Sequence, residues 1–384
     1  MQQNKKLILF WLTALLLVSC IKPFDPDISL SDTDKVVINA QINDIDTVQK
    51  IEISLTSAIS KPEFKPLSGC SVRVVADDGT SFGFYEATAG DYFGTIDPAY
   101  LQPGALLRLE VITPQGERIE SAADRMPQGP EISEVYWELT TLEGNRPGNE
   151  RNGIQFYTDL HAEAWHSRFF RWEIVETWEY HADYPFQWYY DGAVHQVIPA
   201  DYSRLICWKT AFVPYVYSLN TINLTNNAFE RFPLHFVSNL TARLAYGYSV
   251  EVRQYALSET SFAYWEQMRL NNEQDAGLFE KQPVPVQGNL RFADNDKEVL
   301  GNFSVSAIRR KRLFVDPVPG LELDFSTGCS ATVLEKGFRE IRPYEYPVYL
   351  LGDDVTYSMV LLSDGCVDCL VHGGINVKPS FWPR

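Results

Sequence analysis

The sequence is short of basic residues. It has 33 Lys and Arg against 50 Asp and Glu, which gives a formal net charge of −17 at pH 7. Nucleic acids and anionic lipid headgroups are bound by clustered Lys and Arg, so we expect neither as a partner. The basic run Arg309-Arg310-Lys311-Arg312 is expected to be a solvated patch on a strand, with two members facing each way. We interpret the acidity as a property that favours solubility.

Motifs of catalysis are also missing. The sequence has no G-x-S-x-G nucleophile elbow, no H-E-x-x-H zinc motif, no P-loop, no dinucleotide fingerprint and no EF-hand run. The six histidines are spread along the chain, and we expect them to be structural. Acid–base pairs need a measured separation that a sequence does not give. We therefore assign no catalytic, cofactor-binding or metal-binding residue, and expect a protein that is not an enzyme.

One apolar run, Leu7 to Val18, follows two lysines at the start of the chain. Its twelve residues are too few to cross a hydrocarbon core of about 30 Å as a helix, so the run indicates a targeting segment. It ends in Leu17-Val18-Ser19-Cys20, which matches the bacterial lipobox, where a small residue precedes a cysteine that is acylated before cleavage. We expect residues 1–19 to be a lipoprotein signal peptide and Cys20 to be the lipidation site. The alternative is an ordinary signal peptide with a chance cysteine near its end.

The acyl chains on Cys20 would anchor the protein without a transmembrane helix, because two or more chains give stable membrane binding. Ile21 stands where an inner-membrane retention signal places Asp, which favours the outer membrane. Residues 20–35 are expected to be a lipidated tether, since the segment after the cysteine is broken by prolines. Both the cell surface and the periplasmic face stay open, and we favour the surface.

Residues 36–126 are expected to form an immunoglobulin-like or prealbumin-like β-sandwich. Short runs rich in β-branched residues, such as residues 50–55 and 71–75, are separated by turn signals. The turns are Asp77-Asp78-Gly79, Ala89-Gly90-Asp91 and Thr113-Pro114-Gln115-Gly116.

Residues 131–384 are expected to form a larger antiparallel β domain with one helical insertion. The prolines and glycine of residues 126–130 cannot continue a strand ladder and indicate the boundary. Strands are predicted at residues 132–139, 153–160, 168–180, 234–237, 244–254, 300–308 and 357–362. The helix is predicted at 258–272, where Ser258 can cap it and Phe262, Trp265 and Met268 recur on one face.

Six cysteines are present, and export would place those after Cys20 in an oxidising compartment. We interpret Cys70 as a buried small hydrophobe in a strand. The remaining four can pair in three ways. We favour two disulfides that join each member of the C-terminal pair to one of the two distant cysteines, and so fasten the C-terminal segment to the sheet. The disulfide candidates are Cys207, Cys329, Cys366 and Cys369. The alternatives are a metal half-site and a redox C-x-x-C motif in the segment 366–372, where the flanking glycines predict a loop rather than a helix.

With these residues described, the chain resembles a family of Bacteroidetes lipoproteins known as domain of unknown function 4249 (DUF4249). The resemblance runs through nearly the whole chain after residue 19, and the ending is its most specific part. Its carriers are Cys20 with Pro23-Phe24-Asp25-Pro26, residues 77–92, 107–121, Cys207-Trp208-Lys209, 277–289, 300–306, Cys366-Val367-Asp368-Cys369 and residues 376–382. The chain has Gln115 where the family often has Asp, and Cys70 is particular to this chain.

The resemblance implies an outer-membrane lipoprotein, often encoded near a TonB-dependent transporter, and supplies no activity or catalytic residue. We expect a non-enzymatic accessory or binding component that is associated with such a β-barrel transporter or with envelope machinery. The alternative is a surface carbohydrate-active enzyme or other hydrolase, which the 9 Trp, the 20 Tyr and the many acids would suit. A third possibility is a scaffold of the cell envelope.

Overall fold

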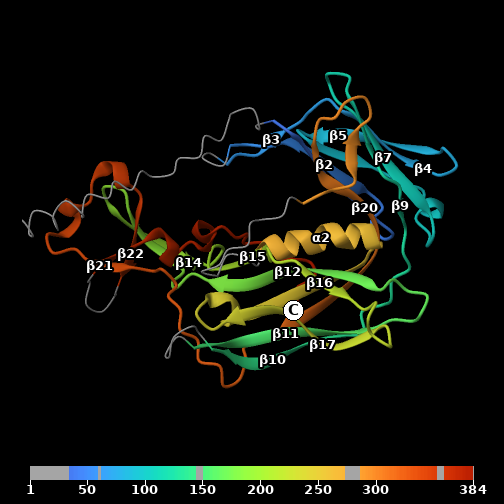
Figure 1. The fold of residues 1–384 in the computed structure, drawn as a ribbon. Helices are drawn as coiled ribbons and strands as arrows, with labels where there is room; N and C mark the ends of the chain where they lie inside the picture. Colours follow the sequence, from blue (N-terminus) through green and yellow to red (C-terminus); the bar gives the residue numbers. More distant parts are fainter. Residues whose placement is uncertain (1–33, 59–61, 144–149, 273–285, 353–358, 384) are drawn as a thin grey trace, which may run out of the picture.

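The computed structural model describes residues 34–58, 62–143, 150–272, 286–352 and 359–383, and it is mainly β (Figure 1). The signal peptide, Cys20 and most of the tether lie outside the described residues. Residues 144–149 and 273–285 also lie outside them. Within the described part of the chain, no helix is both long and apolar enough to cross a membrane.

Residues 36–125 fold into a β-sandwich, as the alternating pattern predicted, and we call this sandwich the first half of the molecule. Its strands are β1 (Val36–Asn43), β2 (Gln49–Leu55), β3 (Lys65–Pro66), β4 (Ser71–Ala76), β5 (Ser81–Thr88), β6 (Asp91–Gly94), β7 (Leu106–Ile112), β8 (Arg118–Ser121) and β9 (Asp124–Arg125), with a short 3-10 helix, η2 (Pro98–Tyr100). The strand order is β1-β2-β6-β5-β4-β7-β8. The sheet bends at β5, which pairs with β6 in one layer and with β4 in the other. Alternate residues such as Ile38, Ile51 and Leu109 are fully buried in one core between the two layers.

The three turns predicted for this half are present. Asp77-Asp78-Gly79 joins β4 to β5, residues 89–90 join β5 to β6, and residues 113–117 join β7 to β8. Gly79 has a φ of +85°, and its N–H donates to the carbonyl oxygen of Ala76 at 3.0 Å. Glycine adopts this left-handed conformation without the steric penalty of a side chain.

The second half is built from the other end of the same 15-stranded sheet and from a separate three-stranded sheet, which face each other across a second core. The larger sheet contains β12 (Phe169–His181), β15 (Ile206–Phe212), β16 (Tyr217–Asn220), β18 (Gly247–Ala256) and β20 (Val299–Val315). The smaller sheet has the order β10-β11-β17, with bounds Glu134–Leu142, Arg151–His161 and Ala228–Ser238. Trp172 and Val250 of the larger sheet and Phe156 of the smaller sheet are fully buried between them.

A satellite sheet has the order β14-β13-β22-β23-β21. Its strands are β13 (Phe186–Tyr190), β14 (Val194–Asp201), β21 (Ala331–Val333), β22 (Val348–Gly352) and β23 (Met359–Leu362). In Figure 1 the labels of this sheet lie to one side of the two sandwiches. The sequence predicted no strand at residues 186–220. All five residues of β13 are half-buried, so this strand lacks the apolar–polar alternation on which such a prediction depends.

The long strand β20 belongs to both halves of the molecule. Its first eight residues pair in parallel with β1, from Val36↔Val299 to Asn43↔Ser306. Its last nine pair antiparallel with β18, from Ala256↔Ala307 to Tyr248↔Val315. Phe303 is accordingly buried in the first core, whereas Ala307 is buried in the second. The preceding strand β19 (Leu290–Phe292) also pairs with β8 of the first sandwich, so residues 290–306 complete that sandwich although they are distant from it in sequence.

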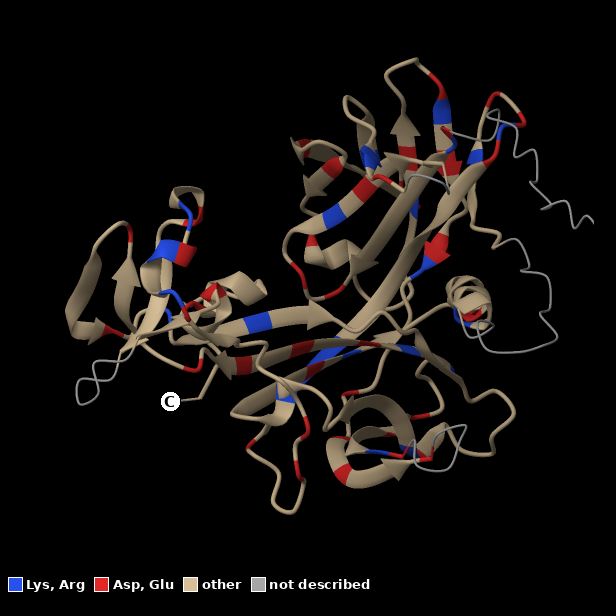
Figure 2. Cartoon of the chain, turned by 90° about the vertical axis from the view of Figure 1, so that its left-hand side faces the viewer, with Lys and Arg blue, Asp and Glu red and all other residues tan. Residues whose placement is uncertain are grey.

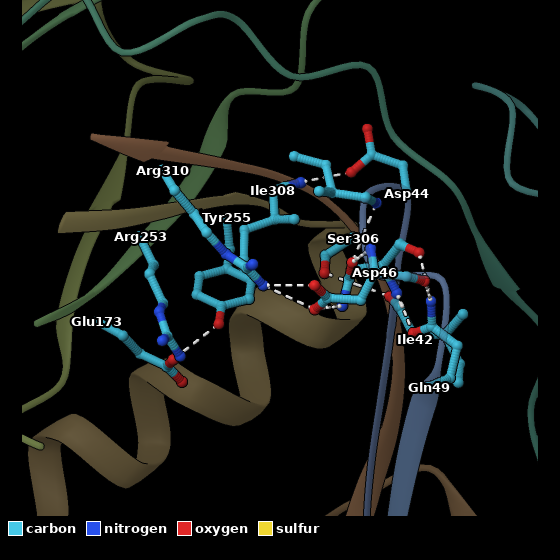
Figure 3. A network of polar contacts seen from close by, with 12 residues as sticks. Ile42, Asp44, Asp46, Gln49, Glu173, Arg253, Tyr255, Ser306, Ile308 and Arg310 are labelled. Carbon is cyan, nitrogen blue, oxygen red and sulfur yellow. Dashed lines mark hydrogen bonds and ion pairs between the residues drawn. The ribbon is translucent and has the colours of Figure 1, made fainter. Parts of the chain in front are cut away.

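The loop between β1 and β2 fastens the two halves at the point where β20 passes from one to the other (Figure 3). Asp44 accepts a hydrogen bond from the N–H of Ile308 at 2.8 Å, and Asp46 binds Arg310 through both carboxylate oxygens at 2.9 and 2.7 Å. Gln49 donates to the carbonyl oxygen of Asn43 at 3.0 Å and so braces the loop.

This arrangement corrects part of our expectation of a solvated patch at Arg309-Arg310-Lys311-Arg312: Arg310 and Lys311 are exposed as expected, but Arg309 and Arg312 are half-buried and all four side chains have partners. Arg309 pairs with Asp44 and Glu131 at 2.9 and 2.5 Å, and Arg312 pairs with Glu251. Lys311 donates to the carbonyl oxygen of Ser133 at 3.0 Å. The run lies on the strand as predicted, but the neighbouring elements supply partners that the local sequence does not reveal.

The predicted helix is α2 (Glu259–Asn272), and Ser258 caps it by accepting a hydrogen bond from the N–H of Ser261 at 3.2 Å. The helix covers the outer face of the larger sheet between the two halves (Figure 1). Arg171 of β12 is only 2% exposed, and its guanidinium carbon lies 4.0 Å from the ring centroid of Trp265 and 4.2 Å from that of Tyr255. This cation is therefore held between a helix ring and a strand ring.

The pairing of β1 with β20 requires a glycine at position 301. Gly301 has a φ of +96°, and a Cβ atom there would lie 1.9 Å from the carbonyl oxygen of Ile38. We expect Gly301→Ala to lower the free energy of unfolding by several kcal/mol, because it adds a backbone clash to the left-handed strain of about 1–2 kcal/mol. Urea unfolding measures the effect.

Gly320→Ala is the matched control. Gly320 has a φ of +82°, and a Cβ atom there would meet no other atom within 4 Å, so only the strain of about 1–2 kcal/mol applies. Equal losses of stability in the two variants would show that β1 and β20 do not approach each other as described.

Candidate functional site

The second half contains a pocket at the end of β12, which we call the aromatic–cationic pocket. It has a cavity volume of about 290 Å³, close to the lower end of the range for small-molecule sites. Its walls come from five segments that are distant in sequence. The lining residues are Trp178, Tyr180, His181, Lys209, Ala242, Tyr246, Phe325, Ser326, Thr327 and His372.

Strand pairing brings two of these walls together. Trp178 of β12 lies directly opposite Lys209 of β15 in the antiparallel register, and directly opposite side chains on paired strands are in contact range. The third wall comes from η3 (Ala242–Leu244) and the turn before β18, which carries Tyr246. Residues 325–327, which follow β20, form the fourth.

Aromatic rings make up much of the wall. The rings of His181 and Tyr246 are stacked, with centroids 3.6 Å apart and planes 17° apart. Trp178 is half-buried and Tyr246 is 41% exposed, so both keep ring surface open to the pocket. Such rings can take up a flat or ring-shaped group by contact with their faces.

Two cations lie near Trp178. The guanidinium carbon of Arg243 is 5.1 Å from the ring centroid and the Nζ of Lys209 is 6.0 Å from it. Figure 2 shows that Lys and Arg are otherwise interspersed with Asp and Glu along the strands. Lys209 donates to the carbonyl oxygen of His372 at 3.1 Å, and no carboxylate of the described residues lies within 4 Å of its Nζ. Lys209 thus presents to the pocket a positive charge that no carboxylate of the described residues pairs with.

A buried acid behind the pocket holds the second cation. Glu176 is 2% exposed, and its carboxylate contacts Arg243 at 3.2 Å and accepts a hydrogen bond from the hydroxyl of Tyr248 at 2.9 Å. The Nε2 of His235 lies 3.4 Å away, an ion-pair contact without hydrogen-bond geometry. Burial alone would raise the pKa of Glu176, but His235 and Arg243 outweigh it and hold the pKa below its usual value.

Tyr180 has a structural part in the pocket. Its hydroxyl donates to the carbonyl oxygen of Cys369 at 2.6 Å, and burial raises its pKa. The group therefore stays neutral at physiological pH and connects β12 to the C-terminal segment. His181 is held in a comparable way, because its Nε2 lies 2.8 Å from the carboxylate of Glu179.

The four cysteines named as disulfide candidates form two disulfides, Cys207–Cys369 and Cys329–Cys366. Each member of the C-terminal pair is joined to a distant cysteine, as we expected. The first bond ties η7 (Cys369–His372) to β15, and so holds His372 at the pocket. The expected loop at 366–372 begins at the last residue of a short 3-10 helix, η6 (Asp364–Cys366), and ends with a second one, η7.

Cys70 differs from our interpretation of it. It is a free cysteine, as expected, but it is only half-buried and precedes β4 instead of lying within a strand. Its N–H donates to the hydroxyl of Tyr92 at 2.9 Å. A position beside the turn explains the partial exposure.

The sequence did not predict the pocket. We expected dispersed histidines, yet His181 and His372 line the same hollow although they are distant in sequence. The signal that could have located it was the Cys207–Cys369 pairing, which brings residues 369–372 next to Lys209. No local motif carries this information, because each segment contributes only one to three residues.

The chain belongs to the family described as "Domain of unknown function (DUF4249)", which matches residues 21–312. This confirms the resemblance stated for the sequence. The ending 366–382, which we regarded as its most specific part, lies beyond the matched residues. No curated protein matches the chain.

Two solved structures are similar to parts of the chain. Trypsin-activated alpha-2-macroglobulin from Escherichia coli has 9% identity and a TM-score of 0.19, over 86% of this chain and 18% of that one. A DUF4785 family protein from Legionella pneumophila has 13% identity and a TM-score of 0.14, over 58% of this chain and 51% of that one. The chain thus spans less than two thirds of either protein, and at these scores neither likeness carries an argument.

The low pKa of Glu176 predicts how stability depends on pH. A carboxylate with a pKa lower in the folded state stabilises the fold above its unfolded pKa of about 4.3, and this contribution is lost as the pH falls through the folded value. We expect Glu176→Gln to lower the free energy of unfolding at pH 7 by about 2 kcal/mol or more, because it leaves Arg243 without its charged partner. The loss should shrink below about pH 4.3.

Urea unfolding from pH 3 to pH 8 measures this dependence. Glu134→Gln is the control, because Glu134 is exposed on β10 and such surface changes stay within about 0.5 kcal/mol. A loss for Glu176→Gln that stays constant over the whole pH range would contradict the ionised state of Glu176.

Proposed function

We propose that this protein is a lipid-anchored, non-enzymatic binding protein of the outer membrane that works beside a β-barrel transporter. The observation that carries the proposal is the aromatic–cationic pocket, which joins open ring faces to Lys209, a cation that is in no ion pair among the described residues. A hollow with a few convergent polar groups and ring surfaces is the usual form of a small-molecule site.

Two titratable side chains of the pocket, Tyr180 and His181, are already occupied, which favours binding over catalysis. General acid–base chemistry needs a group that is free to exchange a proton with the substrate. Tyr180 is committed to the Cys369 carbonyl, and His181 is committed to Glu179. None of the lining residues is an Asp, a Glu or a Cys.

A second hollow contains two carboxylates but offers no better support for a hydrolase. It lies over β1 and β2 and has Asp46 and Glu52 in its wall. Asp46 is bound to Arg310 at 2.7 Å and Glu52 lies 3.4 Å from Lys50. These ion pairs neutralise the acids and hold them as parts of the fold. We therefore prefer the binding role to that of a carbohydrate-active enzyme.

The proposed anchor sets how far the first sandwich can lie from the membrane. Cys20 precedes Asp34, the first described residue, by fourteen positions, and a fully extended chain of this length spans about 50 Å. Asp34 is attached to the first sandwich through Lys65 at 3.2 Å. The proposal therefore keeps the first sandwich near the bilayer, where a membrane partner could reach it.

Replacing the proposed lipidation site tests the anchor. We expect wild-type protein to enter the outer-membrane fraction and to carry fatty acyl mass on the peptide that begins with Cys20. Cys20→Ala should lose both, because no acceptor thiol remains at that position. Cys70→Ala is the matched control and should behave like the wild type. An unmodified thiol on Cys20 in the mature protein would remove the anchor from the proposal.

Isolation of the protein from native outer membranes tests the partner. After mild crosslinking, we expect the wild-type protein to recover a β-barrel transporter, which mass spectrometry would identify. The same isolation from Cys20→Ala cells serves as the control, because that variant should not reach the partner. Recovery of no β-barrel from wild-type membranes would count against the accessory role.

A further inference from the structure

We propose that the aromatic–cationic pocket binds an acidic sugar, that is, a sugar ring that carries a carboxylate. This inference rests on the proposed binding function and names the class of ligand. It begins with Lys209, because an ammonium group has three donors, and the contact with the His372 carbonyl at 3.1 Å uses one of them. The remaining donors can bind an oxyanion, and charge-assisted hydrogen bonds are about twice as strong as neutral ones.

The hydroxyl groups on the opposite wall are also free to donate. The Oγ of Ser326 accepts a hydrogen bond from the N–H of Gly328 at 3.1 Å, and the Oγ1 of Thr327 accepts one from the N–H of Cys329 at 3.4 Å. These contacts use lone pairs of the two oxygens and leave each hydroxyl proton available. The pocket therefore offers an ammonium and two hydroxyl donors, which suits a ligand rich in acceptors.

The aromatic rings of the pocket supply the second contribution to ligand specificity. Trp178 and Tyr246 keep open surface in the pocket, and the apolar face of a sugar ring can pack against such rings. Arg243 adds positive charge near Trp178, although Glu176 already balances it. The unbalanced charge is that of Lys209, so the carboxylate of the ligand is expected beside this residue.

An acidic sugar fits the pocket better than a flat aromatic acid. An aromatic acid would satisfy the rings and Lys209, but it would leave the hydroxyl donors of Ser326 and Thr327 without acceptors. Ser326 is exposed and Thr327 is half-buried, so their hydroxyls would stay with water, and the aromatic acid would gain no hydrogen bond from them. A neutral sugar would satisfy the hydroxyl donors and leave the ammonium of Lys209 without a charged partner. Both requirements are met when ring hydroxyls and a carboxylate are carried by one molecule.

Isothermal titration of the mature protein, purified from membranes in detergent, tests this inference. The probes are sodium glucuronate, glucose as the neutral counterpart, and sodium benzoate as the flat anionic counterpart. We expect glucuronate to bind about tenfold or more tightly than either control, because only glucuronate offers both the charge and the hydroxyl acceptors. Its affinity should fall as the salt concentration rises, since the charge contact is partly open to solvent.

Variants of one residue separate charge from packing. Lys209→Met keeps the aliphatic chain and removes the charge, so glucuronate affinity should fall about tenfold or more, to the level of glucose. Lys209→Arg keeps a cation and should retain most of the affinity. Lys336→Met, which does not line the pocket, is the control and should bind like the wild type. Near-ultraviolet circular dichroism checks that each variant is folded.

The inference is overturned if Lys209→Met binds glucuronate as the wild type does, if glucose or benzoate equals glucuronate, or if none of the three probes binds. The proposed binding function fails by a different result. It fails if native mass spectrometry of the wild-type protein, taken from its own membranes, detects no bound small molecule. It also fails if the variant Trp178→Leu retains the same molecule. A bound molecule without an acidic group would overturn the inference and leave the binding function standing.

Discussion

The pairing of β20 with strands of both halves is the constraint on which the rest of the structure depends. One strand is parallel to β1 over residues 299–306 and antiparallel to β18 over residues 307–315. Asp124 reinforces the crossing, because its buried carboxylate accepts from the N–H of Val305 at 2.8 Å and from the hydroxyl of Ser261 of α2 at 2.9 Å. A buried acceptor with both partners in place is costly to disturb. The two sandwiches and the helix are thus joined at one point, and a shift of β20 would move all three.

The pocket is the functional consequence of this arrangement. The position of β18 fixes β12, which pairs with it from Phe170↔Ala256 to Glu179↔Gly247, and β12 in turn carries Trp178 to its place opposite Lys209. The fifth wall is His372 of η7, which the Cys207–Cys369 bond attaches covalently to β15. This bond closes a loop of 162 residues. A crosslink over so long a loop typically stabilises a protein by about 2–4 kcal/mol. Sheet register therefore holds the walls formed by β12 and β15, and a disulfide holds the wall formed by η7, whereas residues 325–327 lie in a segment without regular secondary structure.

The sequence predicted the elements that have a local signal. Strands β1 and β4 follow from apolar alternation, β12 follows from a long run rich in apolar and aromatic residues that is buried on both faces, and the helix α2 and the glycine turns follow from capping and turn signals. The same reasoning could not identify β13 or β16, whose residues are half-buried or exposed. It also missed the partners of the basic run, which lie up to 265 positions away in sequence, as Arg309 and Asp44 do. The pocket is formed by five segments that are distant in sequence, so the sequence alone does not show that its residues lie close together.

The central claim is that this pocket, rather than another surface of the molecule, receives the ligand. The most direct measurement is a crystal structure of the protein grown with saturating glucuronate. We expect electron density for the sugar in the aromatic–cationic pocket, with the carboxylate within hydrogen-bond distance of the Nζ of Lys209 and the ring against Trp178. Density for the sugar elsewhere on the molecule, with this pocket empty, would contradict the claim.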